Sequence, residues 1–151
     1  MKLLFLLATA PVFAAGPAGF LTWTPAELKN YEKTLHSKVD QNHVANERLP
    51  DMEGHTVLMI HREGTGQAEI HENAADFVYV ISGEADVVVG GTMVGGTTTG
   101  PGEIRGTSIK GGETKKATAG DILHIQPKAP HWFKIDPGKQ ITYFVIKLES
   151  K

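Results

Sequence analysis

Residues 77–84 read Phe-Val-Tyr-Val-Ile-Ser-Gly-Glu, and this stretch decides the fold class. The nearly continuous apolar run over residues 77–82 predicts a β-strand that is buried on both faces. The Gly83-Glu84 pair predicts a turn into a second strand over residues 85–89. The sequence therefore predicts a strand, a turn and a further strand in direct succession.

The sequence on either side of this stretch also predicts β-strands. Residues 55–61 have a period of two, so the odd-numbered residues share one strand face and the even-numbered residues the other. Further strands are predicted over residues 67–72, 121–126, 132–135 and 140–148. Short strands of similar length between Gly and Pro turns predict a closed or sandwiched antiparallel sheet.

The N-terminal part of the chain divides into two predicted segments. Residues 1–15 combine a positive start at Lys2, an apolar run and small terminal residues, which is the pattern of a secretory signal peptide. The alternatives are an uncleaved anchor and a buried apolar arm. Cleavage would make the protein periplasmic or secreted, with no further membrane contact. Residues 16–53 are expected to form an arm with one short helix, which starts with a capping box of Thr24 and Glu27 and runs to about Lys38.

Composition excludes several kinds of site. The 151 residues contain no cysteine, so any metal must be held by His, Asp, Glu or water. The formal net charge is −2, which gives no sign of a nucleic-acid partner.

Two groups of residues in the predicted strands carry metal-binding side chains. Glu69 and His71 are two apart on one strand, so their side chains point the same way, about 6.6 Å apart along the chain. Asp76 follows a short turn, and His131 begins a later strand directly after Pro130. Two imidazoles with one or two carboxylates suit Fe, Mn, Zn, Ni or Cu as divalent ions. A lone strand histidine is more often a packing or surface residue, so this spacing alone is not specific.

The residues around these groups resemble the two sequence motifs of the cupin superfamily. The first motif ends at Gly83. In that alignment Asp76 stands where cupins have a glutamate, and His71 stands at the second of two histidines. Glu69 replaces the first histidine, and Gly64 misses the opening glycine by one position.

The second motif begins at Gly120 and has its histidine at His131. Its proline, second glycine and asparagine are replaced by Gln126, Lys128 and Ile135. Lysine at the glycine position implies a turn that needs no positive φ, or else a strained turn. Residues 102–106 and 136–140 are similar to those of small exported bacterial cupins that lack an assigned activity.

The resemblance implies an all-β fold, an antiparallel jelly-roll β-barrel over residues 54–151. The short N-terminal helix precedes this barrel in the sequence. Cupins with the complete motifs hold a divalent metal with three histidines and one glutamate. In this sequence the metal ligands would be Glu69, His71, Asp76 and His131, and two carboxylates favour harder metals such as Mn or Fe. Asp76 is shorter than glutamate, so it either reaches the ion or orients His71. The resemblance also implies that a homodimer can form.

Two further features of the sequence have more than one interpretation. His124 shares a strand face with Ile122, and we expect that face to line the barrel, where the imidazole would act as a general acid or base. The alternative is a packing residue. The Gly- and Thr-rich residues 90–112 form either a flexible surface excursion or a lid that delivers Glu103 and Arg105 to the barrel mouth.

Three functions are compatible with these features, and the sequence does not decide whether the protein is an enzyme. The first is a small-molecule metalloenzyme of the dioxygenase, isomerase or lyase class, with Glu69 and His124 as catalytic residues that move protons. The second is a non-catalytic periplasmic protein that binds a metal or a small ligand. The third is a barrel whose site is vestigial.

Overall fold

A computed structural model gives the fold, and the structure describes residues 19–49 and 54–149. The predicted signal peptide over residues 1–15 lies outside these residues. In the two described ranges, no helix combines the length and the apolar character needed to cross a membrane.

One helix precedes a series of strands in the part of the chain that the structure describes. The helix is α1 (Pro25–His36). The strands are β1 (Val44–Arg48), β2 (His55–Arg62), β3 (Ala68–His71), β4 (Ala74–Val89), β5 (Thr92–Val94), β6 (Thr97–Gly100), β7 (Glu103–Gly106), β8 (Ser108–Lys110), β9 (Glu113–Thr118), β10 (Ile122–Ile125), β11 (His131–Lys134) and β12 (Ile141–Glu149).

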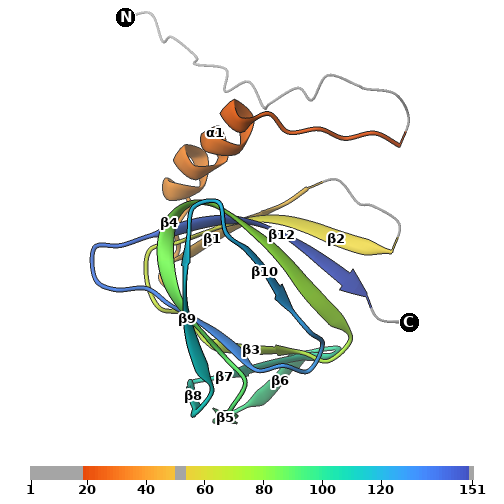
Figure 1. The fold of residues 1–151 in the computed structure, drawn as a ribbon, viewed down its shortest axis with the longest axis vertical. Coiled ribbons are helices and arrows are strands. Elements are labelled where there is room, and N and C mark those ends of the chain that lie inside the picture. Colours follow the sequence, from red (N-terminus) through yellow and green to blue (C-terminus); the bar gives the residue numbers. More distant parts are fainter. Residues whose placement is uncertain (1–18, 50–53, 150–151) are drawn as a thin grey trace, which may run out of the picture.

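The long strand β4 organises the barrel because two different sets of strands pair with its two halves. The first half lies between β12 and β10, and the second half lies between β11 and β9. The main strand order is β1-β2-β12-β4-β11-β3-β7-β6, and β5 pairs with β8 in a separate ribbon. Figure 1 shows these strands curling around a common interior. The predicted antiparallel jelly-roll barrel is therefore confirmed.

Gly83 bends β4 but does not end it, so the predicted turn at Gly83-Glu84 is wrong. Its φ is 74°, and the pairing register with β12 shifts beside it, between Thr142 and Tyr143. The shift leaves Ile81 of β4 outside this register, and an extra residue of this kind is a β-bulge, which bends a strand while pairing continues on both sides. The bulge lets one strand belong to both walls of the barrel.

Apolar side chains form one core inside the barrel and another under the helix. The inner core includes Val80, Val87 and Phe133. The outer core includes Leu35 of α1 and Met59 of β2, both fully buried. Burial of such a side chain is worth about 1.5–3 kcal/mol, so α1 is held on the outside of the barrel by packing (Figure 1).

The N-terminal arm is more regular than predicted. The capping box is confirmed, since the backbone N–H of Glu27 donates to Thr24 Oγ1 and that of Thr24 donates to the Glu27 carboxylate. The helix ends at His36, before the expected Lys38. Residues 44–48 form β1, which pairs with β2, although only a short helix was expected in the arm of residues 16–53.

Residues 90–112 form strands and not a flexible excursion or a lid, but they do bring Glu103 and Arg105 to the barrel site, as the second interpretation expected. β7 pairs with β3 on one side and with β6 on the other, and so extends the barrel wall. Polar Thr-rich strands can occupy this edge because one face remains in solvent. This pairing places Glu103 opposite His71 and Arg105 opposite Glu69.

Candidate metal centre

The four residues that the motif spacing singled out meet inside the barrel. Glu69 and His71 lie on β3, Asp76 lies near the start of β4, and His131 is the first residue of β11. Register pairing sets His131 directly opposite Glu69. Their side chains are only 2–12% exposed.

The turn before β11 fixes the position of His131. Lys128, at the motif's glycine position, has φ 67°, so of the two alternatives the strained turn is the one present. The Lys128 N–H donates to the carbonyl of His71 over 2.7 Å. This bond ties the turn that carries one histidine to the strand that carries the other.

Carboxylate oxygens of Glu69 and Asp76 lie close to the Nε2 atoms of both imidazoles. His71 Nε2 lies 3.6 Å from Glu69 Oε2 and 3.3 Å from Asp76 Oδ2. His131 Nε2 lies 3.8 and 3.7 Å from the same two oxygens. Tetrahedral coordination with bonds of about 2.1 Å requires ligand atoms about 3.4 Å apart, so the spacing suits a metal ion. Glu69, His71 and His131 each offer an atom within 4.8 Å of the others.

Hydrogen bonds orient both imidazoles for metal binding. His71 Nδ1 donates to the Glu103 carboxylate over 2.8 Å, and His131 Nδ1 donates to the carbonyl of Ala129 over 3.1 Å. In a neutral imidazole the other nitrogen, Nε2, then carries a lone pair. Both lone pairs point at the common centre, which is the arrangement that second-shell partners impose on metal-binding histidines.

Two arginines neutralise one side of Glu69. Arg62 Nη2 lies 3.0 Å from Glu69 Oε1, and Arg105 pairs with the same oxygen. Burial alone would raise the pKa of Glu69, but the hydrogen bond with His71 and the charges of the two arginines hold it well below its usual range. Glu69 therefore stays ionised with Oε2 facing the histidines, which favours a metal ligand over the predicted proton carrier.

Lys147 of β12 is a cation at the same centre that the sequence analysis missed. Its Nζ lies 2.7 Å from His71 Nε2 and 3.0 Å from Asp76 Oδ1. Alternation along β12 could have found it, because Lys147 shares the inward face with Tyr143 and Val145. No histidine or motif position drew attention to that strand.

The pKa of His71 indicates that a positive charge is held between the carboxylates of this cluster. Burial lowers the pKa of His71, but hydrogen bonds with Asp76 and Glu69 outweigh burial and raise it to about 9. Nε2 cannot both carry this proton and accept one from Lys147, so the two arrangements exclude each other. In each of them a positive charge lies between the carboxylates. A divalent ion would supply that charge while leaving both Nε2 atoms deprotonated.

His124 lies elsewhere, and the expectation that it lines the barrel is wrong. Its side chain is exposed on β10, beside Phe77, with ring centroids 6.0 Å apart. The neighbouring Leu123 and Ile125 pack into the inner core instead. Because side chains alternate along a strand, packing of these two residues inward turns His124 outward.

A cavity of about 610 Å³ opens beside the cluster. His71 and Glu103 form part of its wall, and so do three cations, Arg48, Arg105 and Lys147. A molecule in this cavity would touch the cluster from the side of β7 and β12.

No protein-family model matches the sequence, and no curated protein matches it. Solved structures match it by fold. The polyketide cyclase RemF from Streptomyces resistomycificus has a TM-score of 0.51 at 16% identity, over 70% of this chain and 65% of that chain. A cupin 2 conserved barrel domain protein from Rhodopseudomonas palustris has a TM-score of 0.50 at 15% identity, over 72% and 62% of the two chains. Ectoine synthase from P. lautus has a TM-score of 0.51 at 19% identity, over 75% and 69%.

These likenesses show the class of fold alone, an antiparallel barrel shared with solved cupin structures, which agrees with the resemblance of the sequence motifs. The chain spans just under two thirds of the length of RemF and of the Rhodopseudomonas protein. At these identities the likeness concerns the fold. The function has to be argued from the site itself.

Proposed function

We propose that this chain is a metal-dependent enzyme that acts on a small anionic molecule. The observation that carries this proposal is the convergence of Glu69, His71 and His131 next to a cavity whose wall holds three cations and two carboxylates, Glu103 and Glu149. Arg105 and Lys147 contribute positive charge to that wall, which favours a carboxylate or a similar anion.

The residues fit a divalent ion, with Glu69, His71 and His131 as ligands and Asp76 facing both imidazoles. When bound, the ion would act as a Lewis acid toward an oxygen of the substrate. The ion is one of the divalent ions Fe, Mn, Zn, Ni and Cu that suit two imidazoles and one or two carboxylates.

Lys147 and Arg105 have separate roles in this proposal. Lys147 Nζ borders both the cluster and the cavity, so it can give a proton to a bound molecule or take one from it. Arg105 pairs with Glu69 and Glu103 and also lines the cavity, so it can orient an anion beside the ion. A positioned proton donor favours an isomerase or a lyase over a dioxygenase, although the ligand set also suits non-haem iron.

The contacts of Lys147 also support a second candidate function. Its ammonium reaches His71 Nε2 and Asp76, so it competes with a metal for the same atoms. A barrel in which Lys147 keeps this place would bind an anionic ligand without catalysis.

A proton-exchange experiment separates the two functions. The zinc-, iron- or manganese-loaded protein is incubated in D₂O with a panel of small carboxylic acids, with the corresponding amides as neutral controls. The enzyme should exchange a C–H proton of at least one acid or convert that acid, as followed by ¹H NMR. His71→Ala should abolish the effect. Binding of the acids to metal-free protein, with no exchange by any metal form, would favour the non-catalytic function.

Export is part of the proposal, and the pattern of residues 1–15 supports it. Expression of the full chain in a Gram-negative host should yield periplasmic protein whose sequenced N-terminus lies near Ala15 or Gly16. Recovery of the intact N-terminus in the membrane fraction would show an uncleaved anchor instead.

A further inference from the structure

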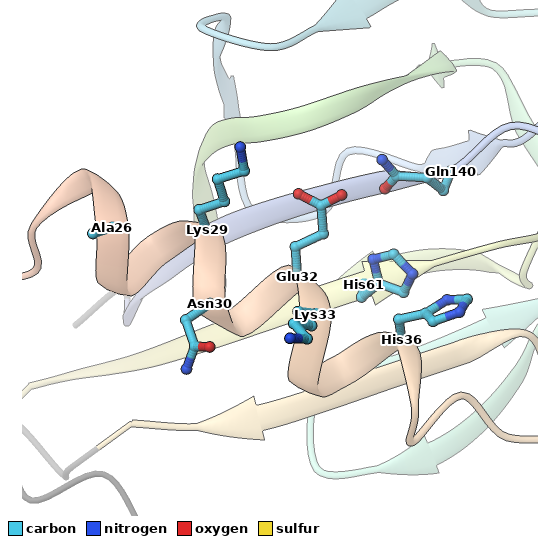
Figure 2. A pocket seen from close by; sticks show the side chains of 8 residues that line it. All are labelled: Ala26, Lys29, Asn30, Glu32, Lys33, His36, His61 and Gln140. Carbon is cyan, nitrogen blue, oxygen red and sulfur yellow. The ribbon is translucent and has the colours of Figure 1, made fainter.

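A second group of metal-binding side chains meets outside the barrel, beneath the C-terminal end of α1. His36 is the last residue of the helix, His61 lies on β2, and Glu63 follows that strand. Each offers one donor atom within 4.8 Å of the others. Figure 2 shows His36 and His61 side by side at the end of the helix.

His61 is buried although it faces outward from the barrel. Its side chain is only 2% exposed, and it shares a strand face with Met59, which packs under the helix. The next residue, Arg62, points the opposite way and reaches Tyr143 and Glu69 in the barrel. The two candidate metal centres therefore lie on opposite faces of β2.

A chain of hydrogen bonds fixes the tautomer of His61. The Thr142 hydroxyl donates to Gln140 Oε1 over 3.2 Å, so its oxygen accepts from His61 Nδ1 over 2.8 Å. With its proton on Nδ1, the neutral imidazole has a lone pair on Nε2. That nitrogen lies 3.0 Å from Glu63 Oε1, where a lone pair faces a carboxylate oxygen. Either a second proton on this imidazole or a bound metal ion would supply the positive charge that this contact needs.

His36 completes the group from the helix. Its Nδ1 meets the same Glu63 oxygen, and its ring is perpendicular to that of His61 at a centroid distance of 5.9 Å. The His36 side chain is 70% exposed, so it can adjust to an ion without disturbing the core.

We propose that His36, His61 and Glu63 bind one divalent transition-metal ion, for which zinc is the best fit. Two imidazoles and one carboxylate with a water as fourth ligand form a common tetrahedral zinc site. Thr142 holds His61 in the tautomer that this site needs. His36 and His61 border a cavity of about 650 Å³, which is also lined by Lys29, Lys33 and Gln140 among others. The ion would fasten the end of the helix to β2.

Zinc stoichiometry of the full chain tests this proposal. His36→Ala should bind one zinc equivalent fewer per chain than the wild type, whatever the barrel cluster binds. Glu63→Gln should weaken the same equivalent by about 100-fold or more, since even second-shell changes cost 10–100-fold. His124→Ala is the matched control, because it removes an exposed histidine on β10 and should leave the stoichiometry unchanged.

Cobalt gives a second readout of the same ion. Co(II) in this site should show the visible absorption of tetrahedral coordination, and His36→Ala should remove that component. Thr142→Val keeps the side-chain shape and should weaken binding by about tenfold. Equal zinc stoichiometry and affinity in wild type, His36→Ala and Glu63→Gln would overturn the proposal. That result would not contradict the separate proposal that the barrel cluster binds a metal ion.

Discussion

At the scale of single residues, the barrel cluster is defined by charges that face each other. The Nε2 atoms of two histidines lie 3.3–3.8 Å from one oxygen each of Glu69 and Asp76. Such an arrangement attracts a positive charge, and Lys147, a proton on His71 and a metal ion compete to provide it.

Metal affinity at this cluster should fall as the pH falls. Burial lowers the pKa of His71, but Asp76 and Glu69 raise it to about 9, so below that pH a proton occupies the metal-binding nitrogen. A metal ion must displace this proton, and the zinc dissociation constant should therefore rise about tenfold for each pH unit below about 9. Calorimetric titration of the His36→Ala variant, which leaves the barrel cluster intact, measures this. A constant affinity across this range would contradict a protonated His71.

Removal of Lys147 should strengthen metal binding. Lys147→Met keeps the length of the side chain but removes the ammonium that lies 3.0 Å from Asp76. Because a nearby like charge opposes a cation, zinc affinity should rise about tenfold or more. Lys110→Met, at an exposed position on β8, is the control and should change nothing. Weaker binding in the Lys147 variant would instead make the lysine a support of the site.

Sequence reasoning found the ligands but not the residues that hold them. His71 and His131 stand at motif positions, so their convergence could be predicted. Glu69 and Asp76 could be predicted as their partners, because strand alternation and the motif alignment both point to them. The pairing of Arg62 with Glu69 depends on two distant strands lying side by side, which no local pattern encodes. For the same reason His61 and His36 gave no signal of a shared site.

At the scale of elements, β4 and β7 depart most from the sequence prediction. Gly83 was interpreted as a turn because glycine often ends strands, whereas here it takes a positive φ within one long strand, close to a bulge at Ile81. The Thr-rich β6 and the short β7 lack the apolar alternation of a core strand. Backbone pairing joins β7 to β3 and β6 to β7.

Gly83→Ala should destabilise the barrel more than another glycine of similar φ. A Cβ at this position would lie 2.0 Å from the Gln140 carbonyl oxygen, whereas at Gly138, with φ 76°, it would meet nothing within 4 Å. Gly138→Ala should lose only about 1–2 kcal/mol, the cost of a left-handed alanine. Gly83→Ala should lose clearly more, as measured by denaturant unfolding. Equal losses would show that the bulge tolerates a side chain.

At the scale of the whole molecule, the barrel buries the cluster in its interior with a cavity beside it. The fold could be predicted as a whole because the strand pattern and two motifs agreed on it. The reaction could not be predicted, because one barrel can carry many chemistries and the residues around the cavity come from scattered strands.

The central claim is that a metal ion lies between His71 and His131, and anomalous X-ray diffraction from zinc-loaded crystals tests it most directly. The account predicts an anomalous peak at about 2.0–2.2 Å from Nε2 of both histidines and from Oε2 of Glu69. A folded, zinc-loaded protein with no peak between the two imidazoles, and with Lys147 still bonded to His71, would contradict it.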